Sequence, residues 1–123
     1  MYKIWTILVL GIAYILYSGW IYNDATDFGT TMSAKQIEGK QIYQENNCQS
    51  CHQIFGLGGY LGPELTSVMS DKNRGEAYAR AFLENGGGTR MPQFNFTKQQ
   101  VDAILDYLKY VDVNAQPMEN IAN

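Results

Sequence analysis

The chain has 123 residues and a formal net charge of −3 at pH 7, with 12 acidic and 9 basic side chains. This length allows one folded domain, and the acidic balance excludes the basic face on which nucleic-acid-binding proteins depend. The two cysteines, Cys48 and Cys51, are too close in sequence for a disulfide between them to link distant parts of the chain, so a disulfide scaffold is excluded as well.

Residues 1–23 are predicted to form a transmembrane anchor. The stretch from Ile4 to Ile21 contains no charged side chain, and as a helix it would span about 27 Å, close to the thickness of a hydrocarbon core. Lys3 precedes this stretch, whereas Asp24 and Asp27 follow it. The positive-inside rule therefore predicts a single-pass protein of the cytoplasmic (inner) membrane, with a cytoplasmic N-terminus and a periplasmic or extracytoplasmic domain.

A cleaved signal peptide is the alternative interpretation of this segment. Signal-peptide cleavage requires small residues at the end of the apolar run, whereas here the run ends in Trp20-Ile21-Tyr22. These bulky side chains favour an uncleaved anchor.

An all-α domain is predicted from residue 33 to residue 112, after a polar linker at 24–32. Its first helix begins with a capping-box pattern at Ser33 and Gln36, in which each residue's side chain bonds the other's backbone N–H. Gly39 and Tyr43 on this helix allow a close crossing with the last helix, at Leu105 and Leu108.

Two further helices are predicted in this domain, and no β-strand. One runs over residues 74–85 with an apolar stripe at Tyr78, Phe82 and Leu83, and three glycines end it. The other begins after Thr97, where a second capping box opens an apolar stripe of helical spacing that continues to Val111. Residues 113–123 are predicted to be a frayed tail.

Cys48-Gln49-Ser50-Cys51-His52 is the attachment pattern of c-type haem. At this spacing, two thiols on a short bent helix can each bond one vinyl group of the same porphyrin edge. The histidine that follows then reaches the iron from one side. A thioredoxin-like redox pair would need a strand before the motif, and a zinc site would need four ligands where the chain has two cysteines and one histidine. We therefore predict one covalent haem c.

The second axial ligand is expected to be a methionine, because the chain has no second histidine. Met91 is the first candidate, since it stands between a glycine-rich turn and Pro92, and Met69 is the second. A histidine–methionine pair leaves no open coordination position. The iron is then expected to carry electrons, and the chain itself to have no catalytic residue.

Two more residues are candidates for holding the haem. The carbonyl oxygen of Pro63 can accept a hydrogen bond from the far ring nitrogen of His52, because axial histidines usually donate to a carbonyl and proline holds that acceptor rigidly. Arg90 can pair with a haem propionate; a solvated arginine is the alternative.

The domain resembles a class I cytochrome c in the order of its motifs. More narrowly, the chain is similar to the small membrane-anchored cytochrome c component of bacterial nitric oxide reductases. The residues that carry this resemblance are the stretch from Gly56 to Leu65, which follows the haem motif and ends in Pro-Glu-Leu, and the stretch from Met91 to Phe96.

The resemblance implies a partner and a second metal. In that family the small subunit takes electrons from a soluble donor, such as a small cytochrome c or a cupredoxin. It passes them to a large catalytic membrane subunit that contains haem b and reduces two NO to N₂O. A calcium ion at the interface between the two is implied at Gly58 and Tyr60. Leu57 departs from the family's usual glutamate, and Gly59 and Gly62 depart from its alanines.

Three other functions fit the same motifs. The haem could serve an oxygen-reducing haem–copper oxidase, or a free-standing, membrane-tethered electron shuttle between respiratory complexes. A haem gas sensor is a further alternative, which requires an open coordination position on the iron.

Overall fold

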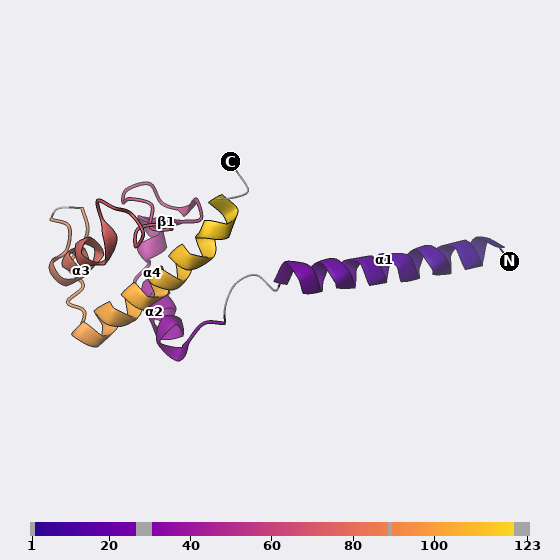
Figure 1. Ribbon diagram of the computed structural model, residues 1–123, viewed down its shortest axis with the longest axis horizontal. Coiled ribbons are helices and arrows are strands. Elements are labelled where there is room, and N and C mark those ends of the chain that lie inside the picture. Colours follow the sequence, from indigo (N-terminus) through magenta and orange to yellow (C-terminus); the bar gives the residue numbers. More distant parts are fainter. Residues whose placement is uncertain (1, 27–30, 89, 120–123) are drawn as a thin grey trace. The chain divides into compact units, whose positions relative to one another are not determined.

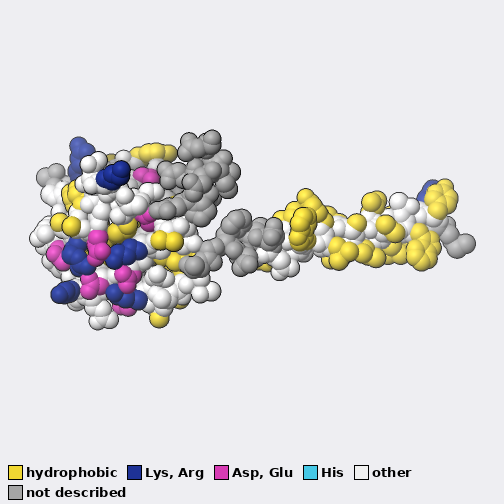
Figure 2. Space-filling view, viewed as in Figure 1, with side chains coloured by type: hydrophobic (Ala, Val, Ile, Leu, Met, Phe, Trp, Pro, Cys, Tyr) yellow, Lys and Arg dark blue, Asp and Glu magenta, His cyan; other side chains and the backbone are white. Residues whose placement is uncertain are grey.

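The computed structural model describes residues 2–26, 31–88 and 90–119 of the protein (Figure 1). The chain divides into two compact units, residues 1–30 and residues 31–123, and each unit is described by itself. Helix α1, Tyr2–Thr26, makes up the first unit. Its segment Tyr2–Asn23 is long and apolar enough to cross a membrane, and the hydrophobic side chains along it are exposed (Figure 2).

The second unit contains three α-helices, α2 (Ala34–Glu45), α3 (Gly75–Asn85) and α4 (Lys98–Glu119). Helix α4 crosses the domain and packs against both α2 and α3 (Figure 1). The most deeply buried side chains lie on α4 and in the turn before α3: Val68, Val101, Ala103, Ile104 and Leu105. The all-α fold class predicted from the sequence is confirmed.

The crossing of α2 and α4 lies at Gly39, which is buried. A Cβ built at Gly39 would lie 2.5 Å from the carbonyl carbon of Ala103 and 2.9 Å from the Cβ of Tyr107. The helices approach this closely because glycine leaves room for the opposing backbone. Leu105 and Leu108, where the contact was expected, are buried in the same hydrophobic core as Ile42 of α2.

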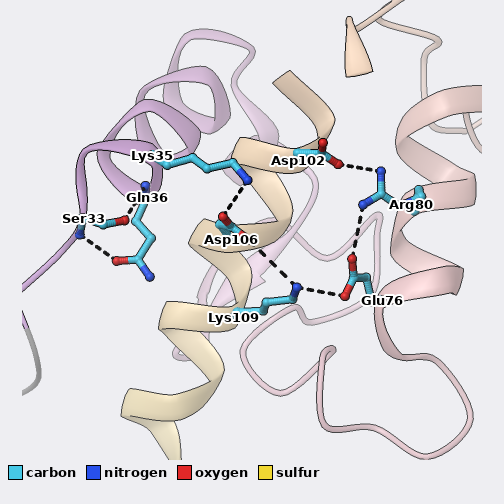
Figure 3. Close-up of polar contacts among 8 residues, drawn as sticks. All are labelled: Ser33, Lys35, Gln36, Glu76, Arg80, Asp102, Asp106 and Lys109. Carbon is cyan, nitrogen blue, oxygen red and sulfur yellow. Dashed lines mark hydrogen bonds and ion pairs between the residues drawn. The ribbon is translucent and has the colours of Figure 1, made fainter. Parts of the chain in front are cut away.

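Both predicted capping boxes are present. Gln36 N donates to Ser33 Oγ at 3.3 Å while Ser33 N donates to Gln36 Oε1 at 2.8 Å, which closes the first turn of α2 (Figure 3). Thr97 and Gln100 make the same reciprocal pair of bonds at the start of α4.

The prediction that no strand forms was wrong in one place. Strands β1 (Gln53–Ile54) and β2 (Leu57–Gly58) form a short antiparallel hairpin directly after the haem motif. Phe55 and Gly56 make the turn with φ of 54° and 72°. Two left-handed residues in succession match the twist of a hairpin, whereas the glycines of this stretch by themselves indicate only a loop.

The predicted end of the last helix at Asp112 was also wrong, because α4 continues to Glu119. Val111, Asp112 and Ala115 are buried on its inner face, so the apolar helical spacing extends one turn further than predicted. Asp112 is held by a tertiary contact, since its Oδ2 accepts a hydrogen bond of 2.7 Å from the backbone N–H of Ser70.

Charged side chains gather on one face of the domain and join its helices (Figures 2 and 3). Lys35 Nζ lies 2.8 Å from Asp106 Oδ2, which connects α2 to α4. Helix α3 is joined to α4 by two pairs, Arg80–Asp102 at 2.7 Å and Glu76–Lys109 at 2.8 Å. These pairs fix α3, whose other face forms part of the site described next.

Candidate haem site

The Cys48-to-His52 motif folds as a short 3-10 helix (η1, Cys48–Ser50) that bends at its end. The backbone N–H groups of Cys51 and His52 both donate to Cys48 O, at 3.2 and 2.9 Å. Asn47 before the motif has a φ of 51°, which turns the chain sharply from α2 into it. This local winding brings both thiols and the imidazole to the wall of one cavity.

The cavity has a volume of about 480 Å³, which lies within the usual range for ligand pockets. The motif forms one part of its wall, helix α3 supplies a second part, and the loop before α4 supplies a third. The lining residues from these three segments include Cys48, Cys51, His52, Tyr78, Ala79, Phe82, Leu83, Arg90, Met91 and Pro92. A mostly apolar pocket with two thiols, an imidazole, a thioether and one guanidinium has the donor set that a covalent haem c requires.

His52 is oriented by the loop that follows the motif. Its Nδ1 lies 2.8 Å from Pro63 O. A carbonyl oxygen can only accept a hydrogen bond, so Nδ1 carries the proton. The lone pair of Nε2 is then free to bind a metal. The pair of atoms expected from the sequence thus lies within hydrogen-bond distance.

Met91 lines the same cavity and also packs against the hydrophobic core. Gly87 N donates to Met91 O at 3.1 Å, which closes the loop between α3 and Met91. Met69, the second candidate, packs against the core. Among the described residues that line the cavity, Met91 is the one methionine. Two other methionines, Met1 and Met118, lie outside the residues whose side chains the structure describes.

Similarity to known proteins indicates the same cofactor as the side chains that line the cavity. The family model described as cytochrome c matches residues 36–112. The chain belongs to the cytochrome c family. A cytochrome c domain carries its haem c covalently, so the two thiols that line the cavity are the expected points of attachment.

The cytochrome is also similar to proteins named as the C subunit of nitric oxide reductase. It is 35% identical over 98 residues to the one from Stutzerimonas stutzeri, which covers 70% of this chain and 66% of the relative. It is 30% identical to that of Halomonas halodenitrificans over 78% of this chain and 71% of the relative. It is also 30% identical to that of Paracoccus denitrificans, over 65% of this chain and 61% of the relative. The chain thus spans roughly two thirds of the length of these relatives, and it belongs with them by sequence.

Cys48 and Cys51 lie in half-buried positions. Burial raises the pKa of the Cys48 thiol, because desolvation disfavours the thiolate. Ser50 Oγ lies 3.7 Å from Cys51 Sγ, a distance at which sulfur takes part in a weak hydrogen bond.

The residues implied for calcium do not line the haem cavity. Gly58 and Tyr60 lie in the hairpin and just after it, and neither lines the cavity. Tyr60 is 89% exposed and Leu57 is 78% exposed. Within the described part of the chain, no group of three or more His, Cys, Asp or Glu side chains is placed to hold a metal ion.

Glu64, the acid nearest to this loop, has a local partner. Its carboxylate accepts a hydrogen bond from the hydroxyl of Thr66, and that hydroxyl in turn accepts from Phe55 N at 2.6 Å. The carboxylate thus braces the turn of the hairpin.

Most of the cavity wall was not predicted from the sequence. Tyr78, Phe82 and Leu83 were recognised as an apolar stripe on a helix, but a stripe of this kind usually packs in a core. In the structure, Tyr78 and Phe82 line the cavity and remain 39% and 36% exposed. Spacing along one helix cannot show whether a stripe faces a core or a cofactor, so no signal in the sequence separated the two.

Proposed function

We propose that this cytochrome is the electron-transfer subunit of a nitric oxide reductase. It would pass electrons from a soluble donor, a small cytochrome c or a cupredoxin, to a large catalytic subunit that contains haem b and reduces two NO to N₂O. The similarity to three proteins named as the C subunit of nitric oxide reductase supports this proposal. The donor set that gathers around one cavity supports the electron-transfer role.

In this proposal Cys48 and Cys51 would hold the haem through thioether bonds, and His52 and Met91 would bind its iron. When bound, the haem supplies a one-electron ferric–ferrous couple. Two protein ligands would leave the iron no position for NO, and reduction would then belong to the partner subunit. The Met91 thioether would favour the ferrous form and raise the reduction potential.

Two residues tune or position the haem in the same proposal. The hydrogen bond from His52 Nδ1 to Pro63 O fixes the ring orientation and makes Nε2 a stronger donor. Arg90 lies at the cavity wall with an exposed side chain. We propose that its guanidinium pairs with a haem propionate, an interaction that Arg makes through two parallel hydrogen bonds.

We propose the same topology as the sequence predicts, with helix α1 crossing the membrane from a cytoplasmic N-terminus. The connection between α1 and α2 holds seven residues, 27–33. A connection this short favours electron transfer to a partner in the same membrane.

Calcium at Gly58 and Tyr60 is a proposal that depends on the partner. Calcium takes 6–8 oxygen ligands, and carboxylates usually supply several of them. Here the cytochrome would contribute backbone carbonyls, with Leu57 adding no oxygen from its side chain. The remaining ligands would have to come from the large catalytic partner or from haem propionates.

The observation that carries the proposed function is the meeting of Cys48, Cys51, His52 and Met91 at one cavity, in a chain related to the C subunit of nitric oxide reductase. The test is purification of the native complex from membranes, with haem and metal analysis and assays of NO and O₂ consumption. We expect a haem-b subunit with non-haem iron and consumption of NO. Copper with O₂ consumption would indicate an oxidase subunit, and a chain that purifies alone would indicate a free shuttle. Binding of CO by the reduced cytochrome would indicate a sensor.

A further inference from the structure

Two segments of the chain are hydrogen-bonded side by side at the proposed iron ligand: the end of the haem motif with its hairpin, and the loop that returns afterwards. Gly62 N donates to Cys51 O at 2.8 Å, and Leu65 N donates to Gln53 O at 2.8 Å. The bond from the His52 ring to its carbonyl acceptor lies between these two. The position of that acceptor therefore depends on how firmly the returning loop is held against the motif.

A further link, at the far end of this pairing, is made by a side chain. Phe55 N donates to Thr66 Oγ1 at 2.6 Å, and the same hydroxyl donates to the carboxylate of Glu64. Thr66 is buried, with 8% of its surface exposed, and its hydroxyl both accepts and donates within this loop. The backbone bonds of the pairing do not depend on residue type, whereas this last link can be removed by a substitution.

The Thr66 hydroxyl also stabilises an unfavourable backbone conformation in the hairpin turn. Phe55 has a φ of 54°, in the left-handed region that residues other than glycine rarely adopt. A residue keeps such a conformation only where the contacts around it enforce it. The Phe55 N–H is the group that Thr66 accepts, so without this hydroxyl the turn loses one of the contacts that hold it beside the returning loop.

We infer that Thr66 is a positioning residue for the proposed iron ligand His52. Its hydroxyl closes the end of the pairing, which keeps the neighbouring Leu65–Gln53 bond from fraying and so holds the Pro63 carbonyl at the imidazole. Thr66 itself does not line the cavity. This inference rests on the proposed role of His52 as an axial ligand. It adds that a hydroxyl outside the cavity wall controls the hydrogen bond of that ligand.

The strength of the hydrogen bond from His52 Nδ1 bears on the reduction potential. A histidine that donates to a well-placed acceptor is a more basic ligand, and a more basic ligand favours ferric over ferrous iron. Thr66→Val keeps the branched shape of the side chain but can neither accept from Phe55 N nor donate to Glu64. We therefore expect it to weaken the bond between His52 and Pro63 and to raise the midpoint potential. Thr66→Ser keeps the hydroxyl and should retain the wild-type potential.

The experiment compares Thr66→Val and Thr66→Ser with Thr97→Val in the full-length, haem-loaded protein. Thr97→Val is the matched control, because the Thr97 hydroxyl also accepts a backbone N–H, from Gln100 at 3.3 Å, but at the start of α4 and outside the cavity wall. We measure the midpoint of unfolding, the midpoint potential and, by NMR of the diamagnetic ferrous state, the exchange of the His52 Nδ1 proton. Both valine variants should unfold more easily. Only Thr66→Val should raise the potential and speed the proton exchange, roughly fivefold, as the loss of one hydrogen bond predicts.

An unchanged potential and exchange rate in Thr66→Val would overturn the inference, as would equal changes in Thr97→Val or a Thr66→Ser protein that behaves like Thr66→Val. Should Thr66→Val not fold, the wild-type ferrous protein still tests the claim. Its Phe55 amide proton is expected to be protected from exchange, and an unprotected amide overturns the inference. A wild-type EPR spectrum without a low-spin histidine–methionine signal would instead contradict the proposed ligands, so the two failures are distinguishable.

Discussion

The His52 side and the Met91 side of the cavity are built from different kinds of contact. His52 is placed by residues close to it in sequence: the 3-10 turn that starts at Cys48 and the loop that returns at Gly62 and Pro63. Met91 is placed by a loop between two helices, and the position of that loop depends on how α3 packs on α4. One of the two proposed ligands is therefore positioned by local structure and the other by the tertiary fold.

Of the substitutions at the two sides of the cavity, His52→Ala should have the largest effect on the haem spectrum. His52→Ala removes the proposed ligand on the locally built side, and the chain has no other histidine to replace it. We expect complete loss of the low-spin spectrum of the ferric protein, measured by absorbance and EPR. A variant that keeps this spectrum would show that His52 does not bind the iron.

Replacing Met91 should have the next largest effect. Met91→Leu keeps a similar volume but removes the thioether, so we expect a lower midpoint potential and binding of CO to the reduced protein. The matched control is Met69→Leu, which changes a methionine that packs on the core. CO binding by Met69→Leu but not by Met91→Leu would reverse the assignment of the two methionines.

Crowding the Met91 loop should have a smaller effect. A Cβ at Gly87 would lie 2.7 Å from the Met91 Cβ and 3.3 Å from the Phe82 ring. Gly87→Ala is expected to lower the free energy of unfolding by about 1–3 kcal/mol, as overpacking usually does, and to let some CO bind. Denaturant unfolding and CO titration measure the two effects.

The neighbouring Gly88→Ala serves as the control for backbone strain. Gly88 has a φ of 66° and nothing within 4 Å of a built Cβ, so its substitution strains the backbone without crowding Met91. It is expected to destabilise the fold while leaving CO excluded. Equal CO binding by both variants would show that the loop, not the contact with Met91, controls ligation.

Weakening the ion pairs of α3 should have the smallest effect. Hydrogen bonds from Lys109 and Arg80 lower the pKa of Glu76 below its usual 4.5. A carboxylate whose pKa is lower in the folded state stabilises the fold above its unfolded pKa, and that contribution is lost as the pH falls through the folded pKa. Glu76→Gln should therefore cost roughly 0.2–1 kcal/mol at pH 7 and progressively less below about pH 4.

Denaturant unfolding at pH 7 and pH 3, in low and high salt, checks this prediction. The difference between wild type and Glu76→Gln should also shrink in high salt, because the pair is near the surface and screened. The control is Glu45→Gln, which changes an exposed carboxylate of α2 outside this cluster. A difference that is independent of pH would mean that Glu76 acts through packing and not through its charge.

Much of the locally determined structure could be predicted from the sequence. The capping boxes at Ser33 and Thr97 placed the starts of α2 and α4, because a cap depends on residues only three positions apart. The attachment motif and the return of the chain at Pro63 were recognised for the same reason. The hairpin at Phe55 was missed, since its turn places a non-glycine residue in a left-handed conformation that its residue type does not predict.

The sequence by itself determined the apolar N-terminal segment, the haem motif and the pairing of His52 with Pro63, since each follows from residue types at short spacings. Only the tertiary structure decided that Tyr78 and Phe82 face a cavity, that Met91 rather than Met69 lines it, and that α4 continues beyond Asp112. These features depend on contacts between segments far apart in the chain, such as Asp112 with Ser70. A helical stripe specifies which residues share a face, and only packing specifies what that face meets.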